Sequence, residues 1–355
     1  MQHMACDKTF SADLNYSVKF DYLRVFAMAG VVAVHLSQQF PFPGMLKSIM
    51  GMGAYCVQIF YVISAYLGCS FFFRKNASCT AYYKKRALRI LPTYYAAIVA
   101  AMFYVEIFTK GYCDDVLHLG WLRYFLGLNV ILPSNNFYEW NNAFGFWTMT
   151  NFLFFYAIIP LLIKFAQSFR RCIILFLTLF IIAGISQRLA NCLPVNGIFS
   201  ELEWLVVWSP LVQMQHFAIG MLVFFAMKES KKSYACILLL SLALCPQRIC
   251  NYSLLYSILT GLFIMAVKDS DITIQGTKQA YLSFVSKYSF HVYLTHLLAL
   301  KIATEISKLF CTPATFTYYS LKIFIAILTT FVLCCFLEIV QRLCNKYFSS
   351  NKPHN

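Results

Sequence analysis

The stretch FDYLRVFAMAGVVAVHL, residues 20–36, is apolar enough to enter a membrane, yet it contains Asp21, Arg24 and His35. Hydrocarbon penalises ionisable side chains, so such residues face the interior of a helix bundle or a water-filled cavity. A helix turns about 100° and rises about 1.5 Å per residue, which places Arg24 and His35 on one face, about 16 Å apart. Asp21 lies one turn before Arg24 and can pair with it. We therefore expect one polar stripe that faces the bundle interior.

The composition of the whole chain supports a membrane protein. Of 355 residues, 60% are hydrophobic and 12% are charged, whereas soluble domains are about half apolar and about a quarter charged. Apolar runs recur along the chain and leave no room for a soluble domain between them. We predict an all-α, polytopic integral membrane protein with a single domain over residues 1–355, including short cytoplasmic tails at 1–19 and 346–355.

About ten spans are predicted from runs that approach the roughly 20 residues a membrane helix needs. They cover residues 20–40, 50–73, 90–109, 144–164, 172–190, 204–227, 233–246, 251–267, 281–305 and 317–341. Residues 120–132 are short and interrupted, and we expect an interfacial or re-entrant segment there. With the N-terminus inside, twenty Lys and Arg fall in inner segments and six in outer loops. Because positive charge favours the cytoplasmic side, both termini are expected in the cytoplasm.

The net charge of +15 does not indicate nucleic-acid binding, because the basic residues lie in short loops where they orient spans. No metal site is expected either. Most cysteines lie within apolar runs and no Cys or His spacing matches a known ligand set.

The polar stripe has two readings that spacing alone leaves open. Asp21 and Arg24 can be an ion pair at the inner interface, with His35 a hydrogen-bonded interior residue. Alternatively, the stripe is a functional site, as ionisable groups within membrane spans often are.

Five motifs in order resemble the acyltransferase 3 family of polytopic bacterial membrane O-acyltransferases. The first is the opening stretch, with its Asp-x-Leu-Arg segment and its Arg and His eleven residues apart. The others are GAYCVQIFYVISAYLG (53–68), YYKKRALRILPTYY (82–95), FWTMTNFLFFYAIIPLL (146–162) and SFHVYLTHLL (289–298). Two positions depart from the family pattern: Ala65 replaces a usual Gly, and Asn151 stands in a stretch where many members carry Glu. We therefore assign no carboxylate role there.

The resemblance implies transfer of an acyl group, usually acetyl from cytoplasmic acetyl-CoA, to a hydroxyl of an exported or cell-surface glycan. It makes Asp21, Arg24 and His35 candidate catalytic residues, with His35 as the general base, because histidine titrates near neutrality. Arg86 and Arg89 lie one turn apart, and together with Arg24 they are expected to bind the phosphates of CoA. Smaller expectations, each open to a packing role instead, fall on Ser64 and Tyr66 as donor contacts and on Trp147, Tyr156, Tyr293 and His296.

The expected partners follow from this reaction: the lipid bilayer, acyl-CoA as a substrate rather than a bound cofactor, and a glycan or lipid-linked saccharide as acceptor. The expected location is the cytoplasmic membrane. The alternative is a polytopic transporter of a polysaccharide precursor or small anion. Against it, the chain has no paired half-chain symmetry and no matching pair of Gly- or Pro-broken helices.

Overall fold

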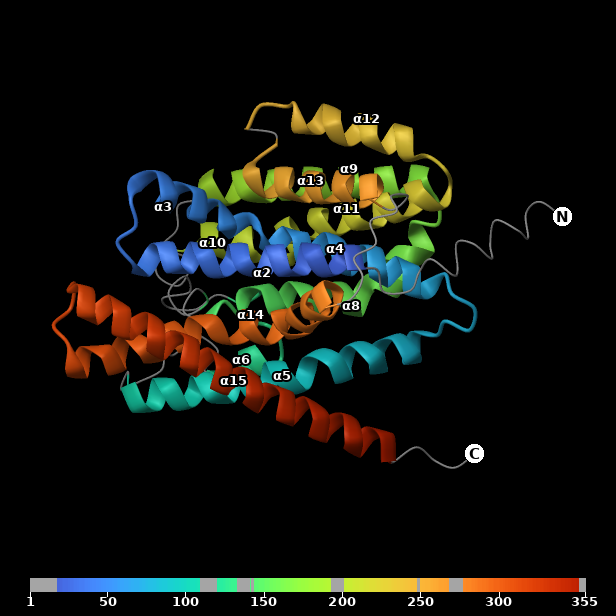
Figure 1. Cartoon of the computed structure of the whole chain (residues 1–355). Coiled ribbons are helices and arrows are strands. Elements are labelled where there is room, and N and C mark those ends of the chain that lie inside the picture. The colour runs from blue at the N-terminus through green and yellow to red at the C-terminus, as the bar shows by residue number, and fades with distance from the viewer. Residues whose placement is uncertain are drawn as a thin grey trace.

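The computed structural model describes residues 18–108, 120–132, 141, 144–192, 201–247, 250–267 and 277–350. Every regular element in these ranges is a helix, as predicted (Figure 1). The elements are α2 (Val18–Gln39), α3 (Gly44–Gly51), the 3-10 helix η1 (Met52–Tyr55), α4 (Val57–Phe72), α5 (Cys79–Phe108), α6 (Leu122–Phe125), α8 (Trp147–Phe165), α9 (Phe169–Cys192), α10 (Leu202–Trp208), α11 (Pro210–Lys228), α12 (Lys232–Ala243), α13 (Tyr252–Val267), α14 (Thr277–Phe310) and α15 (Phe316–Ser350).

Seven helical segments within the described residues are long and apolar enough to cross a membrane. They correspond to the predicted spans built on α2, α3–α4, α5, α8, α9, α10–α11 and α15. The three other predicted spans are helical but are not among the seven. Helix α12 has 12 residues and extends only about 18 Å, well short of the roughly 30 Å hydrocarbon core. The chain is thus a polytopic membrane protein, and the number ten and the cytoplasmic termini remain predictions.

The first and last helices of the described chain reach the same end of the bundle. Helix α2 begins and α15 ends at the same end of the bundle (Figure 1). The expected tails lie largely outside the described residues, although α15 continues through residues 346–350. The segment expected to be re-entrant holds only the four-residue helix α6, which is too short to span.

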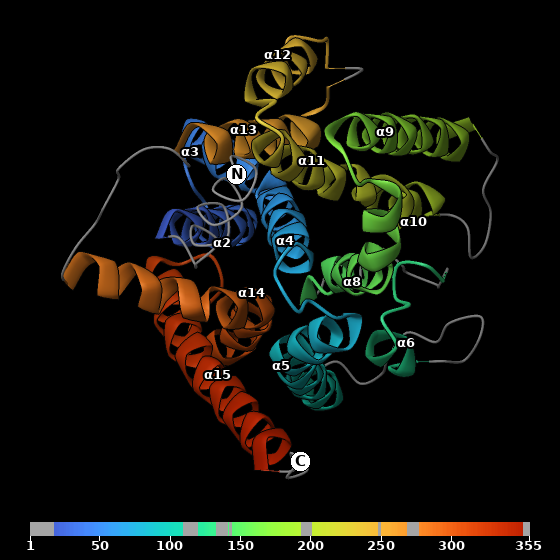
Figure 2. The same ribbon diagram turned by 90° about the vertical axis from the view of Figure 1, so that its right-hand side faces the viewer.

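Helix α4 lies at the centre of the bundle, with α2, α8 and α11 around it (Figure 2). Glycine allows the closest approaches. A Cβ on Gly53 would lie 1.9 Å from the carbonyl oxygen of Gly30, and one on Gly220 would lie 2.2 Å from that of Val62. Small residues permit such close backbone contact between membrane helices. These contacts hold α2 against η1 and α11 against α4.

Helix α5 contains Pro92, which has no N–H to donate to the carbonyl four residues earlier. That carbonyl belongs to Leu88, and it accepts instead from the side-chain amide of Gln341 on α15. Thr93 Oγ1 donates to the carbonyl of Ile90 at 3.0 Å. The carbonyls around the proline are therefore satisfied from a side chain of α5 itself and from a neighbouring helix.

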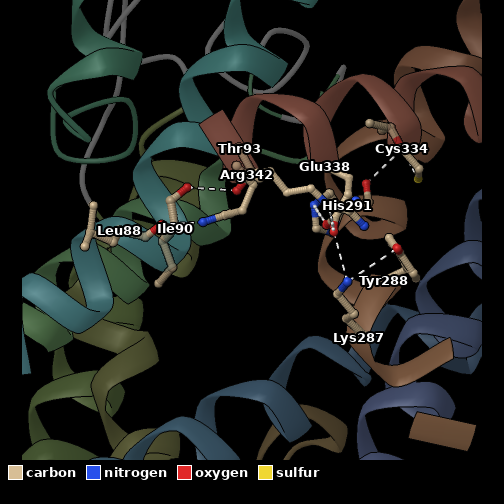
Figure 3. A network of polar contacts seen from close by, with 11 residues as sticks. Leu88, Ile90, Thr93, Lys287, Tyr288, His291, Cys334, Glu338 and Arg342 are labelled. Atoms are coloured by element: carbon tan, nitrogen blue, oxygen red, sulfur yellow. Dashed lines mark hydrogen bonds and ion pairs between the residues drawn. The ribbon is translucent and has the colours of Figure 1, made fainter. Parts of the chain in front are cut away.

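A charged cluster joins α14 to α15 (Figure 3). Glu338 on α15 accepts from Lys287 Nζ at 2.9 Å and from Arg342 Nε at 2.8 Å. His291 Nε2 lies 3.8 Å from the second oxygen of that carboxylate. Charged groups in a membrane domain are costly unless they are paired, and this cluster pairs them.

Candidate active site

A cavity with about 770 Å³ of empty space, including its open mouth, lies between α2, α4, α5, α8 and α14. Three cations line it: Arg24 from α2, and Arg86 and Arg89 from α5. Three hydroxyl-bearing residues expected at the site also line it, namely Ser64, Tyr156 and Tyr293. The structure thus gathers, from five helices, six of the residues that the sequence singled out.

Aromatic rings hold Arg86 at the cavity wall. Its guanidinium carbon lies 5.3 Å from the ring centre of Tyr82 and 5.0 Å from that of Tyr156. The Tyr156 hydroxyl in turn lies 3.3 Å from Ser64 Oγ. Contact with ring faces orients a guanidinium without neutralising it, so the charge stays available for an anion in the cavity.

Arg24 is oriented by a buried carboxylate. Its Nη1 donates to Asp21 Oδ1 at 3.3 Å, and Asp21 is fully buried. Two serines of α14 also donate to Asp21: Ser286 Oγ at 2.6 Å and Ser283 Oγ at 3.1 Å. Asp21 does not line the cavity, and its carboxylate contacts Arg24 and the two serines instead.

His35 lies on the same helix face but in a different environment. Its ring centre is 5.2 Å from that of His296 on α14, and the ring of Tyr293 is 6.0 Å from His296. The Tyr293 hydroxyl lies 2.6 Å from Thr148 Oγ1. Since Tyr293 also lines the cavity, it connects the arginine-lined space to the two histidines.

Hydrogen bonds define which ring nitrogens of the histidines carry protons. His35 Nδ1 lies 2.9 Å from Gln38 Oε1, and His296 Nδ1 lies 2.8 Å from the carbonyl oxygen of Tyr293. A backbone carbonyl only accepts, so Nδ1 is the donor in neutral His296, and Nδ1 is the donor in neutral His35 with the amide oxygen of Gln38 turned towards it. Each Nε2 is consequently a bare lone pair. A neutral imidazole with a free Nε2 is suited to accept a proton from a hydroxyl.

Two expected site residues pack elsewhere among the described residues. The ring of Tyr66 lies 5.5 Å from Phe20 and 5.7 Å from Phe224, away from the cavity lining. Trp147 stacks on Trp208 at 5.4 Å. Neither Tyr66, expected as a donor contact, nor Trp147, expected as a further site residue, lines the cavity, and both rings are used in helix packing.

Several polar residues at the site were not predicted. Ser283, Ser286 and Ser289 recur every third residue of α14, the spacing that places side chains on one helix face. Two of these serines bind Asp21, and Ser289 lines the cavity. That serine spacing can be read from the sequence and indicates a polar helix face. No pattern in the sequence, in contrast, points to Gln38 as the neighbour of His35.

Replacing Asp21 with alanine should destabilise the protein by about 3–5 kcal/mol, the usual effect of removing one partner of a buried ion pair. The change withdraws the acceptor from Arg24, Ser283 and Ser286 at once. Thermal unfolding in detergent measures it. Ser283→Ala is the matched control, with an expected loss of about 1 kcal/mol for one hydrogen bond. Equal melting temperatures for Asp21→Ala and wild type would contradict this role.

A comparison with protein families gives a match that covers nearly the whole chain. The sequence model of the acyltransferase 3 family, described as an acyltransferase domain, matches residues 17–339. In searches of curated proteins and of solved structures, nothing matches.

Proposed function

The chain belongs to the acyltransferase 3 family, and from this premise we propose that it is an O-acyltransferase of the cytoplasmic membrane. The donor is cytoplasmic acyl-CoA, with acetyl as the first candidate, and the acceptor is a hydroxyl of an exported or cell-surface glycan. The observation that carries the proposal is the cavity in which Arg24, Arg86 and Arg89 converge, connected through Tyr293 to His35 and His296.

The donor fits the charge of the cavity. CoA carries a pyrophosphate and a 3′-phosphate, and guanidinium groups bind phosphate through paired, charge-assisted hydrogen bonds. Much of the remaining lining is apolar, including Phe60, Leu67 and Phe152. The phosphates would lie at the arginines, and the thioester arm would extend along the apolar wall towards Tyr293.

The transfer step follows from the free ring nitrogen of His35. Nε2 takes the proton of the acceptor hydroxyl as its oxygen attacks the thioester carbonyl carbon. The carbon–sulfur bond breaks, and the departing thiolate of CoA recovers the proton from His35. Such a positioned base contributes about 10²–10⁴-fold to the rate. No acidic residue is needed at Asn151, whose amide is used in a hydrogen bond of 2.8 Å to the carbonyl of Trp208.

The decisive experiment is consumption of acetyl-CoA by the purified protein in liposomes, followed by release of free CoA thiol. We expect consumption that rises when a glycan fraction of the producing cell is added, and an acetyl mass increment on that fraction. A transporter would move its cargo without consuming acyl-CoA. Absence of thiol release with acetyl-, succinyl- and longer acyl-CoA would overturn the proposal.

A further inference from the structure

An apolar groove lies between α2, α14 and α15, with about 1890 Å³ of empty space that includes its open side. Phe284 from α14 and Ile327 and Phe331 from α15 line it, and they are 61%, 66% and 67% exposed. The groove therefore opens on the outer surface of the bundle. Hydrocarbon surrounds that surface in a membrane protein, so lipid chains can enter the groove from the side.

Charge is confined to one end of this groove. Among the described residues that line it, the charged ones are Glu338 and Arg342, near the C-terminal end of α15. Helix α2 begins at the same end of the bundle (Figure 1), which the distribution of positive charge predicts to be cytoplasmic. An apolar body with a charged end has the same division as a phospholipid, whose acyl chains are apolar and whose head is charged.

The charged end carries more positive than negative charge. Lys287 Nζ and Arg342 Nε donate to the same carboxylate, that of Glu338, at 2.9 Å and 2.8 Å (Figure 3). The side chains of Lys287 and Arg342 are 54% and 69% exposed, and Lys346, one turn after Arg342, is exposed as well. An ammonium has three donors and a guanidinium has five. Both cations can therefore bind a phosphate while they remain bound to Glu338.

We propose that this groove binds an anionic phospholipid of the leaflet at that end, with its phosphate at Lys287 and Arg342. One acyl chain runs along the groove from Glu338 to Ile327. These positions are eleven residues apart on α15, or about 16 Å, which is close to half of the roughly 30 Å hydrocarbon core. Basic pockets between membrane helices on the cytoplasmic side bind anionic lipid heads. The site is separate from the proposed reaction, because it involves neither acyl-CoA nor the two histidines near Tyr293.

Native mass spectrometry of the purified full chain in detergent tests the preference for an anionic head. The protein is titrated with phosphatidylglycerol and, in parallel, with phosphatidylcholine that has the same acyl chains. We expect one phosphatidylglycerol per chain to be retained at concentrations at which phosphatidylcholine is not. Equal retention of the two lipids would overturn the proposal.

Substitutions at the charged end test its location. The double variant Lys287→Gln with Arg342→Gln should bind phosphatidylglycerol about thirtyfold more weakly, since each basic residue near an anionic head contributes about fivefold. Arg342→Lys keeps the charge and should retain most of the binding. Arg171→Gln is the matched control, because Arg171 is exposed at the start of α9 and does not line the groove. If the double variant melts at the wild-type temperature and binds phosphatidylglycerol with unchanged affinity, the proposed site is wrong.

A last comparison separates a lipid site from a site for free phosphate. Thr330 lines the groove, whereas Leu328 does not line it and is 52% exposed on the same helix. Thr330→Trp should weaken phosphatidylglycerol binding by about tenfold, the equivalent of roughly two methylene groups withdrawn from apolar contact, and Leu328→Trp should not. Glycerol 3-phosphate, which has the phosphate without acyl chains, should not compete. Competition by glycerol 3-phosphate, or wild-type affinity in a folded Thr330→Trp protein, would show that the groove does not hold the chain.

Discussion

His35→Ala should lower the turnover number for acyl transfer by about 10²–10⁴-fold, the range for loss of a positioned general base. The KM for acyl-CoA should stay near that of wild type, because His35 is not among the residues that line the arginine-lined cavity. The measurement is thiol release by purified protein at saturating donor, paired with glycan acylation in cells at matched membrane levels.

Gln38 offers a graded control for the same role. Its side chain is exposed and accepts from His35 Nδ1 at 2.9 Å. Gln38→Ala should cost less than His35→Ala, because the ring remains and loses only the bond that fixes its tautomer. Wild-type turnover in His35→Ala would remove His35 from the mechanism and leave His296, with its own free Nε2, as the candidate base.

The α2 face was predictable because periodicity fixes which side chains share one side of a helix. That rule placed Asp21, Arg24 and His35 together, and it paired Arg86 with Arg89. It could not give the rotation of one helix against another. The approach of His296 to within 5.2 Å of His35 therefore came only from the structure, as did the packing of Tyr66 between two phenylalanines.

The number of spans could be predicted only in part. Hydropathy located the seven described segments that are long and apolar enough to cross a membrane and the shorter apolar helices α12 and α13, but α12 ends too early to cross the hydrocarbon by itself. The bond from Gln341 to the carbonyl that Pro92 leaves free joins residues 253 positions apart. The local sequence shows that Pro92 leaves one carbonyl of its helix without an N–H donor. It does not show which distant side chain donates to that carbonyl instead.

The second large effect is expected at the arginines. Arg89→Ala and Arg86→Ala should each raise the KM for acyl-CoA by about tenfold or more, since a hydrogen bond to a charged group contributes about 1.5–3 kcal/mol. Turnover at saturating donor should change far less, because in the proposed site the arginines would bind phosphates remote from the reacting carbonyl. Arg→Lys variants keep the charge but lose paired geometry, and raising the donor concentration should partly rescue them.

The control separates anion binding from the orienting role of a basic segment. Lys84 belongs to the same basic run and is exposed, but it does not line the cavity. Lys84→Ala should leave the KM unchanged. A donor that lacks the 3′-phosphate provides a second comparison. Replacing an arginine that binds this phosphate should raise the KM less for the truncated donor than for the complete one. A wild-type KM in Arg89→Ala with both donors would show that the charge orients α5 in the membrane and does not hold CoA.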